Sequence, residues 1–197
     1  SDQWWNIVLY AGQNNVADTS ATIGGWTTDA THYIKIYTPY DSAEVGTSQR
    51  HIGKLDTMKY YINTTATGNY GRALSISQDY TRIEGLQMQS NAGGFSFNSG
   101  VVISSVGIVI DKTIIRGILG GGSFSYGGIY MNTASITAEI RNSIIYGFSG
   151  TSGSNSIWAR DVTSVEIYNT IVYGGSTGIG IQRTAGSVTV TNSAVFS

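Results

Sequence analysis

One eight-residue phrase, repeated along the second half of the chain, constrains the fold more than any other feature. Four copies occupy residues 110–117, 140–147, 167–174 and 190–197, and residues 83–90 form a weaker copy. Their first residues are 27 (83 to 110), 30 (110 to 140), 27 (140 to 167) and 23 (167 to 190) residues apart. Intervals of this order, with some variation in length, are typical of a solenoid in which each copy stacks on the next.

Each copy has two short strand-like halves on either side of one turn position. In order along the chain, the residues at this position are Gly85, Lys112, Asn142, Asn169 and Asn192. Gly and Asn tolerate a left-handed backbone better than other residues, so we expect a sharp bend here. Stacked Asn side chains can then form a hydrogen-bonded ladder. Lys112 does not fit this pattern, and we expect a loosened bend at its position.

A further pair of apolar residues precedes each copy and predicts a third strand. These pairs are Leu74/Ile76, Phe95/Phe97, Ile129/Met131, Ile157/Ala159 and Ile179/Ile181. Apolar residues alternate with others as they do in β-strands, and no stretch has helical periodicity. Three short strands per repeat, each pairing with its equivalent about 4.8 Å away in the next repeat, predict an all-β parallel solenoid.

The phrase Ile-x-Asn-Ser/Thr-Ile-Ile/Val-Tyr-Gly, at residues 140–147 and 167–174, resembles the rungs of pectate-lyase-like β-helix proteins. Residues 25–36 and 49–61 resemble the opening of β-helix proteins from secreted bacterial and phage sources. The resemblance implies a single-stranded right-handed parallel β-helix, here of about six to seven rungs. It leaves the activity open, because such proteins include lyases, hydrolases, phage tailspikes, adhesins and structural members.

The chain of 197 residues is expected to form one domain over residues 1–197. We expect irregular turns with long loops over residues 1–70 and regular turns over residues 71–197. The final copy lacks the polar terminal repeat or amphipathic helix that closes most solenoids. We therefore expect either that a partner covers this end or that the chain is a piece of a longer one.

Composition argues against several classes of function. Charged residues make up only 12% of the chain and the formal net charge is −1, so nucleic acid is not an expected partner. No apolar run of about eighteen residues occurs, so no membrane span is expected. The chain has no cysteine and its two histidines lack a metal-binding spacing. We therefore expect neither a metal nor another cofactor.

Stacking the copies places charged residues of successive turns in columns on the outer surface. Glu139 and Glu166 are expected one rung apart, roughly 5 Å, near Arg141 and Asp111. Two carboxylates this close can act as an acid/base pair in polysaccharide cleavage or share a cation. The alternative is a surface ladder of charges without a catalytic role. A lyase of the resembling group would carry several calcium-binding Asp beside a catalytic Arg or Lys, and the acids here are more scattered.

The second half of each copy is apolar on both faces of its predicted strand, which usually means that both faces are covered. One face presents a stripe of six residues: Ile114, Ile144, Ile171, Tyr146, Tyr173 and Phe196. An N-terminal segment, or a loop at residues 119–126, would cover this stripe within one chain. Alternatively, the stripe is a subunit interface, which predicts a homo-oligomer or larger assembly, or a platform on which sugar rings stack.

Two smaller clusters are also candidates. His51 beside Arg50 would form a polar site or simply be solvated. Asp161 beside Arg160 and near Trp158 would bind a sugar or form a local salt bridge.

The sequence favours a non-catalytic, structural or adhesive function in an extracellular or virion assembly, such as a phage tail protein, a capsid-surface protein or a filament subunit. Low charge, ends without caps and the doubly apolar strand support it. Two alternatives stay open, a polysaccharide-degrading enzyme that uses the acids above and a carbohydrate-binding module. The extracellular or virion setting rests on the resemblance of the fold.

Overall fold

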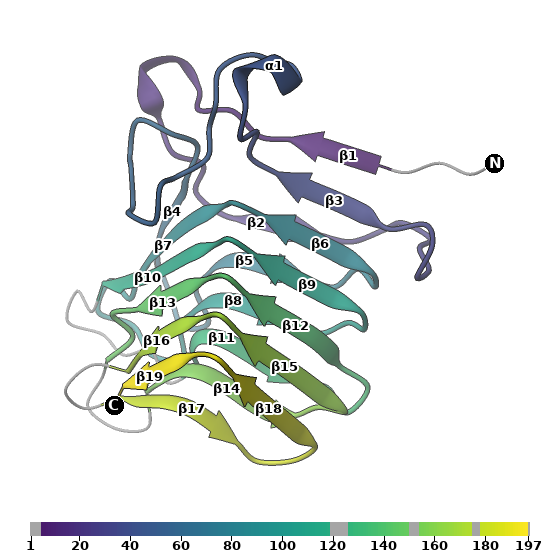
Figure 1. Ribbon diagram of the computed structural model, residues 1–197. Helices are drawn as coiled ribbons and strands as arrows, with labels where there is room; N and C mark the ends of the chain where they lie inside the picture. The colour runs from purple at the N-terminus through teal and green to yellow at the C-terminus, as the bar shows by residue number, and fades with distance from the viewer. Residues whose placement is uncertain (1–4, 119–125, 150–153, 175–177, 197) are drawn as a thin grey trace.

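The computed structural model describes residues 5–118, 126–149, 154–174 and 178–196. Over these residues the chain forms a parallel β-solenoid of about seven turns (Figure 1). In Figure 1 the chain runs from right to left along the front, returns behind and moves down the axis, which gives a right-handed coil. The predicted all-β parallel architecture is confirmed.

Three sheets run the length of the solenoid, and all neighbouring strands in them are parallel. Sheet A contains β1 (Trp5–Val8), β3 (Ile34–Tyr37), β6 (Thr81–Glu84), β9 (Ile108–Asp111), β12 (Thr137–Arg141), β15 (Ser164–Tyr168) and β18 (Ser187–Thr191). Sheet B contains β4 (Ile62–Thr65), β7 (Gln87–Asn91), β10 (Ile114–Ile118), β13 (Ile144–Tyr146), β16 (Ile171–Tyr173) and β19 (Ala194–Phe196). Sheet C contains β2 (Ala21–Ile23), β5 (Arg72–Ile76), β8 (Ser99–Ile103), β11 (Gly127–Asn132), β14 (Asn155–Asp161) and β17 (Ile179–Arg183).

Helix is scarce. Among the described residues it is confined to α1 (Ser42–Val45) and a 3-10 turn at Gln13–Asn15. Asp41 caps α1 by accepting a hydrogen bond from the Ala43 amide at 2.9 Å.

The core is made of columns of aliphatic side chains that run along the axis. Strand alternation turns every second residue inward, and the register places equivalent residues of successive turns side by side. One such column in sheet A contains Ile36, Ile83, Ile110, Ile140 and Ile167, all of them buried. Burying a side chain of this size contributes about 1.5–3 kcal/mol, so the repeated aliphatic positions are the main source of stability.

The turn position between sheets A and B has a left-handed backbone in every regular turn. Its φ angles are 75° at Gly85, 51° at Lys112, 50° at Asn142, 50° at Asn169 and 45° at Asn192. The loosened bend expected at Lys112 is therefore wrong. The Lys112 amide donates to the Arg141 carbonyl at 3.1 Å, as the Asn142 amide donates to the Tyr168 carbonyl. The backbone hydrogen bond to the next turn holds the chain in this bend, whichever side chain occupies the position.

One of the predicted third strands is misplaced. The residues that pair with Leu74 and Ile76 are Val101 and Ile103 of β8, whereas Phe95 and Phe97 lie in the preceding turn. The predicted pair Ile179/Ile181 does lie in β17, where Ile181 pairs with Ile157 of β14. The misplacement of Phe95/Phe97 arises because a short apolar pair can be matched to a strand without knowing the length of the loop before it.

One aromatic side chain fills the corner between sheets B and C. Phe148 follows β13 and is fully buried. A methyl group added to Gly128 would lie 2.9 Å from its ring, and one added to Gly117 would lie 2.8 Å from it. These glycines have no side chain because the Phe148 ring occupies that space.

Candidate functional site

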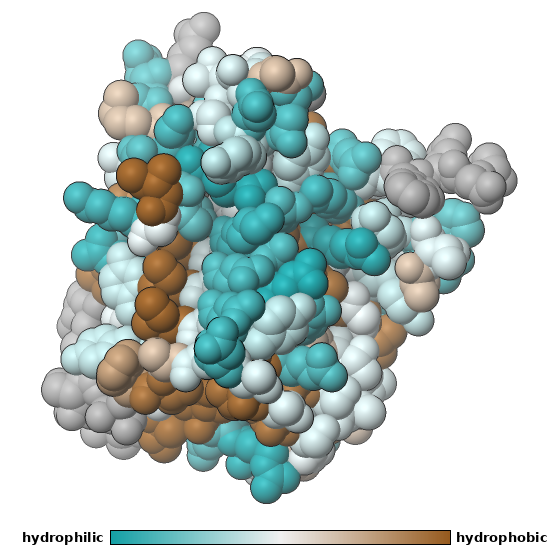
Figure 2. Space-filling view, in the orientation of Figure 1, coloured by the Kyte–Doolittle hydropathy of each residue, from teal (hydrophilic) through white to brown (hydrophobic). Residues whose placement is uncertain are grey.

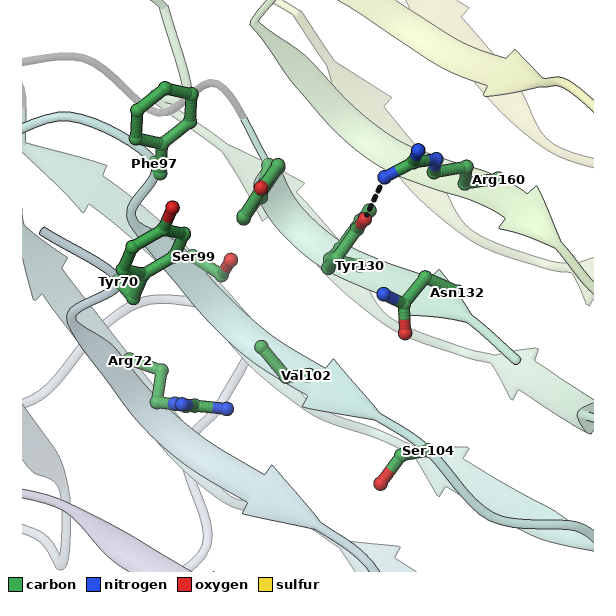
Figure 3. Close-up of a pocket in the computed structure, with 10 residues that line it drawn as sticks. Tyr70, Arg72, Phe97, Ser99, Val102, Ser104, Tyr130, Asn132 and Arg160 are labelled. Atoms are coloured by element: carbon green, nitrogen blue, oxygen red, sulfur yellow. Dashed lines mark hydrogen bonds between the residues drawn. The ribbon is translucent and has the colours of Figure 1, made fainter.

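A groove of about 340 Å³ lies on the outer surface of sheet C (Figure 3). Its lining combines aromatic rings, two arginines and small polar side chains: Tyr70, Arg72, Phe97, Ser99, Val102, Ser104, Tyr126, Tyr130, Asn132 and Arg160. These residues come from β5, β8, β11 and β14, from the turns that precede the first three of these strands and, for Ser104, from the residue after β8. Segments far apart in sequence therefore build one continuous surface.

Strand alternation turns the floor of the groove away from the core, although Tyr130 on this floor is only 3% exposed because the Tyr126 ring stacks on it. Ile129 and Met131 of β11 point into the core, so Tyr130 between them faces outward, and Trp158 of β14 lies beside Tyr130 in the register. Val102 of β8 is the neighbour of Tyr130 on the other side. The outward residue at this register position is therefore Val102 in β8, Tyr130 in β11 and Trp158 in β14, so aromatic side chains replace the aliphatic one toward β14.

The aromatic wall of the groove stands on turns with an unusual backbone. Tyr70 and Phe97 have φ angles of 69° and 60°, a conformation that bulky residues rarely adopt. The Tyr70 amide donates to the Ser96 carbonyl at 3.3 Å, and the Gly71 amide donates to Oδ1 of the buried Asn98 at 2.8 Å. The two turns are therefore hydrogen-bonded to each other, which holds both rings in place.

The rings contact one another in a row along the solenoid. Tyr70 and Phe97 are stacked with centroids 5.5 Å apart, and Phe97 lies 5.6 Å from Tyr126. Tyr126 stacks almost parallel on Tyr130, with centroids 4.2 Å apart, and Trp158 lies 5.2 Å from Tyr130. Five aromatic side chains thus cover neighbouring turns without a break, and Tyr70, at 56% exposure, presents its ring to solvent.

In the part of the chain that the structure describes, the two arginines of the groove form no ion pair. Nη1 of Arg160 donates to the Tyr130 hydroxyl at 3.1 Å, and its guanidinium lies 5.8 Å from the Trp158 ring. Nη1 of Arg72 donates to Oγ of Ser75 at 3.3 Å. Within the described residues neither guanidinium lies within 4 Å of a carboxylate. The predicted alternative of a local Arg160–Asp161 salt bridge is thus not what the geometry shows.

A buried hydroxyl lies beneath the ring row. Oγ of Ser99 has no hydrogen-bond partner among the described residues, although the residue is almost fully buried. An unpaired buried polar group costs free energy, commonly about 1–3 kcal/mol. Figure 3 shows this hydroxyl between Tyr70 and Tyr130, on the floor of the groove.

The four acidic and basic residues predicted as the least unlikely catalytic group lie elsewhere, on the outer face of sheet A. The register places Glu139 beside Glu166 and Arg141 beside Asp111. Arg141 bridges Glu139 (Nη1–Oε1 2.5 Å) and Asp111 (Nε–Oδ2 3.2 Å), and the Tyr168 hydroxyl also donates to Glu139. This arrangement is that of a surface charge ladder in which Arg141 pairs with Asp111 and Glu139.

The turn ladder adjoins these charges. The Asn142 amide group donates to Oδ1 of Asp111 at 2.8 Å, Asn169 to Asn142 at 3.4 Å, and Asn192 to Asn169 at 2.6 Å. Gly85 cannot take part, and a methyl group at its position would lie 2.0 Å from Nε of the buried Arg50. These residues hold successive turns together.

The apolar stripe lies on the outer face of sheet B and is visible as a brown band over β10, β13 and β16 (Figure 2). Ile114 is buried, Ile144 is half-buried, and Ile171 is 47% exposed. Tyr146 is half-buried beside Arg116, whereas Tyr173 and Phe196 are 47% and 53% exposed. Exposure therefore increases steadily toward the C-terminal turns.

An N-terminal segment lies against the first part of the stripe, as one alternative expected. Nε2 of His51 lies 2.7 Å from the Lys112 carbonyl, and the Asp56 amide donates to Oε1 of Gln87 at 2.6 Å. Burial lowers the pKa of His51, which favours a neutral ring that donates from Nε2. His51 thus has a structural role. The predicted covering loop at 119–126 lies, apart from Tyr126, outside the described residues.

Two classes of site are not seen in the part of the chain that the structure describes. It contains no group of three or more His, Cys, Asp or Glu side chains placed to bind a metal ion. Nor does it contain a helix long and apolar enough to cross a membrane.

Neither a protein-family model, nor a curated protein, nor a solved structure matches this chain. The groove was largely missed by sequence reasoning. Tyr130 and Trp158 were detectable, since each stands between two inward apolar residues. Tyr70, Phe97 and Tyr126 were not, because they lie in turns whose stacking depends on loop lengths.

Proposed function

We propose that this protein is a non-catalytic glycan-binding solenoid, an adhesive or structural component that acts outside the cell or on a virion surface. The unbroken row of five aromatic rings on sheet C carries this proposal. Aromatic faces provide broad apolar contact, and the hydroxyl and amide groups beside them supply hydrogen bonds, the combination expected of a site for amphipathic ligands. Saccharides present such a combination of C–H faces and hydroxyl groups.

The chemistry of the groove supports binding rather than cleavage. Hydrolysis of a glycosidic bond generally requires a pair of carboxyl groups on either side of the bond. The residues that line the groove include no Asp or Glu. Asp111 and Glu139 pair with Arg141 on the outer face of sheet A, away from the aromatic row on sheet C.

A single exposed ring tests this function. Changing Tyr70 to Asn removes the ring and keeps a residue type that accepts positive φ, so the fold is expected to stay intact. We expect roughly tenfold weaker binding to polysaccharides in affinity electrophoresis, about the effect of 1.4 kcal/mol. The matched control is Tyr40→Asn, because Tyr40 is also well exposed but lies outside the groove. Equal binding by both variants and the unaltered protein would count against the groove.

A second candidate function, self-association through sheet B, is favoured by the exposed part of the apolar stripe. Ile171, Tyr173 and Phe196 form a contiguous apolar surface next to half-buried Ile144. Such surfaces commonly mark interfaces. Changing Ile144 and Ile171 together to Lys is expected to leave a soluble β-solenoid and abolish assembly, as measured by light scattering against the monomer mass of 21.0 kDa. Unfolding of the double variant would show that the column is ordinary core.

A further inference from the structure

The groove brings two positively charged side chains next to its aromatic rings. Lys35 and Arg141 of sheet A each lie within 4 Å of a carboxylate, whereas Arg82 of the same sheet lies over the Tyr33 ring. Arg72 and Arg160 line the groove without such a partner among the described residues. The groove therefore carries two positive charges that form no ion pair with the described residues, on a protein whose formal net charge is −1.

The two guanidinium groups are placed to act on the same ligand. Figure 3 shows Arg72 and Arg160 reaching from opposite sides toward the floor around Val102 and Tyr130. Arg160 is held in position by its hydrogen bond to Tyr130 and by the nearby Trp158 ring. Its hydrogen bond to Tyr130 also raises the pKa of the Arg160 guanidinium, a group that is fully charged at neutral pH in any case.

We propose that the groove binds a negatively charged polysaccharide, whose sugar rings stack on the aromatic row while its anionic groups bind Arg72 and Arg160. This inference rests on the proposed glycan-binding function and specifies its ligand class. Guanidinium groups present a planar fork of donors that matches carboxylate and other oxyanions in a bidentate manner. Asn132 and Ser104 add neutral polar groups at the edge of the same groove.

Matched pairs of polymers test the charge requirement. Alginate and hyaluronan are compared with their carboxyl-reduced forms, in which CH₂OH replaces each carboxylate, and dextran sulfate is compared with dextran. In at least one pair, we expect the anionic polymer to bind more than roughly tenfold tighter than its neutral partner. This preference should weaken as the salt concentration increases. If only the carboxylate polymers, or only dextran sulfate, bind tighter than their neutral partners, the result identifies which anionic group the groove binds.

Variants assign the preference to the groove. Arg72→Gln and Arg160→Gln are each expected to weaken binding of the anionic polymer by roughly tenfold and to leave the neutral polymer unaffected. Arg160→Lys keeps the charge but loses the planar fork, so it should restore only part of the binding. Arg82→Gln is the control, because it removes the same charge from the outer face of sheet A.

Three results would overturn the inference, and they differ in what else they affect. Equal binding of anionic and neutral polymers would refute the charge requirement and leave glycan binding intact. In the second case, the anionic polymer is preferred, but Arg82→Gln weakens this preference as much as Arg160→Gln does. General surface charge, not the groove, would then be responsible. Absence of binding to every polymer would refute both the inference and the proposed function.

Discussion

The outer faces of sheets A and C are built from the same solenoid turns, yet Arg141 on one face and Arg160 on the other have different kinds of partner. On sheet A, Arg141 is bound by Glu139 and Asp111 from its own and a neighbouring turn. On sheet C, Arg160 has a tyrosine hydroxyl as its partner and no carboxylate within 4 Å in the described part of the chain. A charge neutralised by the fold stabilises the stack, whereas an uncompensated charge beside aromatic rings is available to a ligand.

The largest expected effect comes from removing the support beneath sheet C. Phe148→Ala leaves a cavity where the ring packs against Gly117 and Gly128, so the free energy of unfolding should fall by about 3–5 kcal/mol. Urea unfolding measures this loss. The exposed Phe95 provides the control, and Phe95→Ala should change stability by less than about 0.5 kcal/mol. Similar small effects of both changes would contradict the packing account.

Acid should weaken sheet A and not the groove. Burial opposes ionisation of Glu84, but hydrogen bonds from Lys35 and Arg50 prevail and lower its pKa from 4.5 to about 2. Because the folded-state pKa lies below the unfolded one, this stabilisation is present above pH 4.5 and is lost as the pH falls toward 2. Glu84→Gln should therefore cost roughly 2 kcal/mol at pH 7.

The check is urea unfolding of Glu84→Gln and the unaltered protein at several pH values between 7 and 2. The difference in free energy of unfolding should shrink below pH 4.5 and vanish near pH 2. A difference that stays constant over this range would show that Glu84 acts through packing rather than charge.

The smallest expected effects are on stability, and they distinguish Arg141 of sheet A from Arg160 of the groove. Arg141→Gln should lower the free energy of unfolding by about 1 kcal/mol, since its ion pairs are partly exposed and screened by solvent. Its polysaccharide binding should stay unchanged. Arg160→Gln should change stability by less than about 0.5 kcal/mol and weaken binding instead. If the two variants exchanged these outcomes, the contrast between a structural and a ligand-binding face would be wrong.

Much of the fold was predictable because the solenoid is encoded locally. The alternation of aliphatic residues in each repeat predicts the inward columns, and Asn142, Asn169 and Asn192 mark bends that their backbone tolerance explains. Lys112 shows the limit of this reasoning. Its bend is imposed by the hydrogen bond to the next turn, so the side chain at that position carries little information.

The site was less predictable, because it depends on which turns lie side by side. The sequence by itself determined a parallel β-solenoid, the aliphatic core and the stripe on sheet B, since these follow from residue type and spacing within each repeat. Only the tertiary structure brought Tyr70, Phe97, Tyr126, Tyr130 and Trp158 into one row. It also left Arg72 and Arg160 without an ion pair to any described residue. The physical reason is that loop lengths and inter-turn hydrogen bonds set the register of residues outside the repeat, and that register decides which side chains meet.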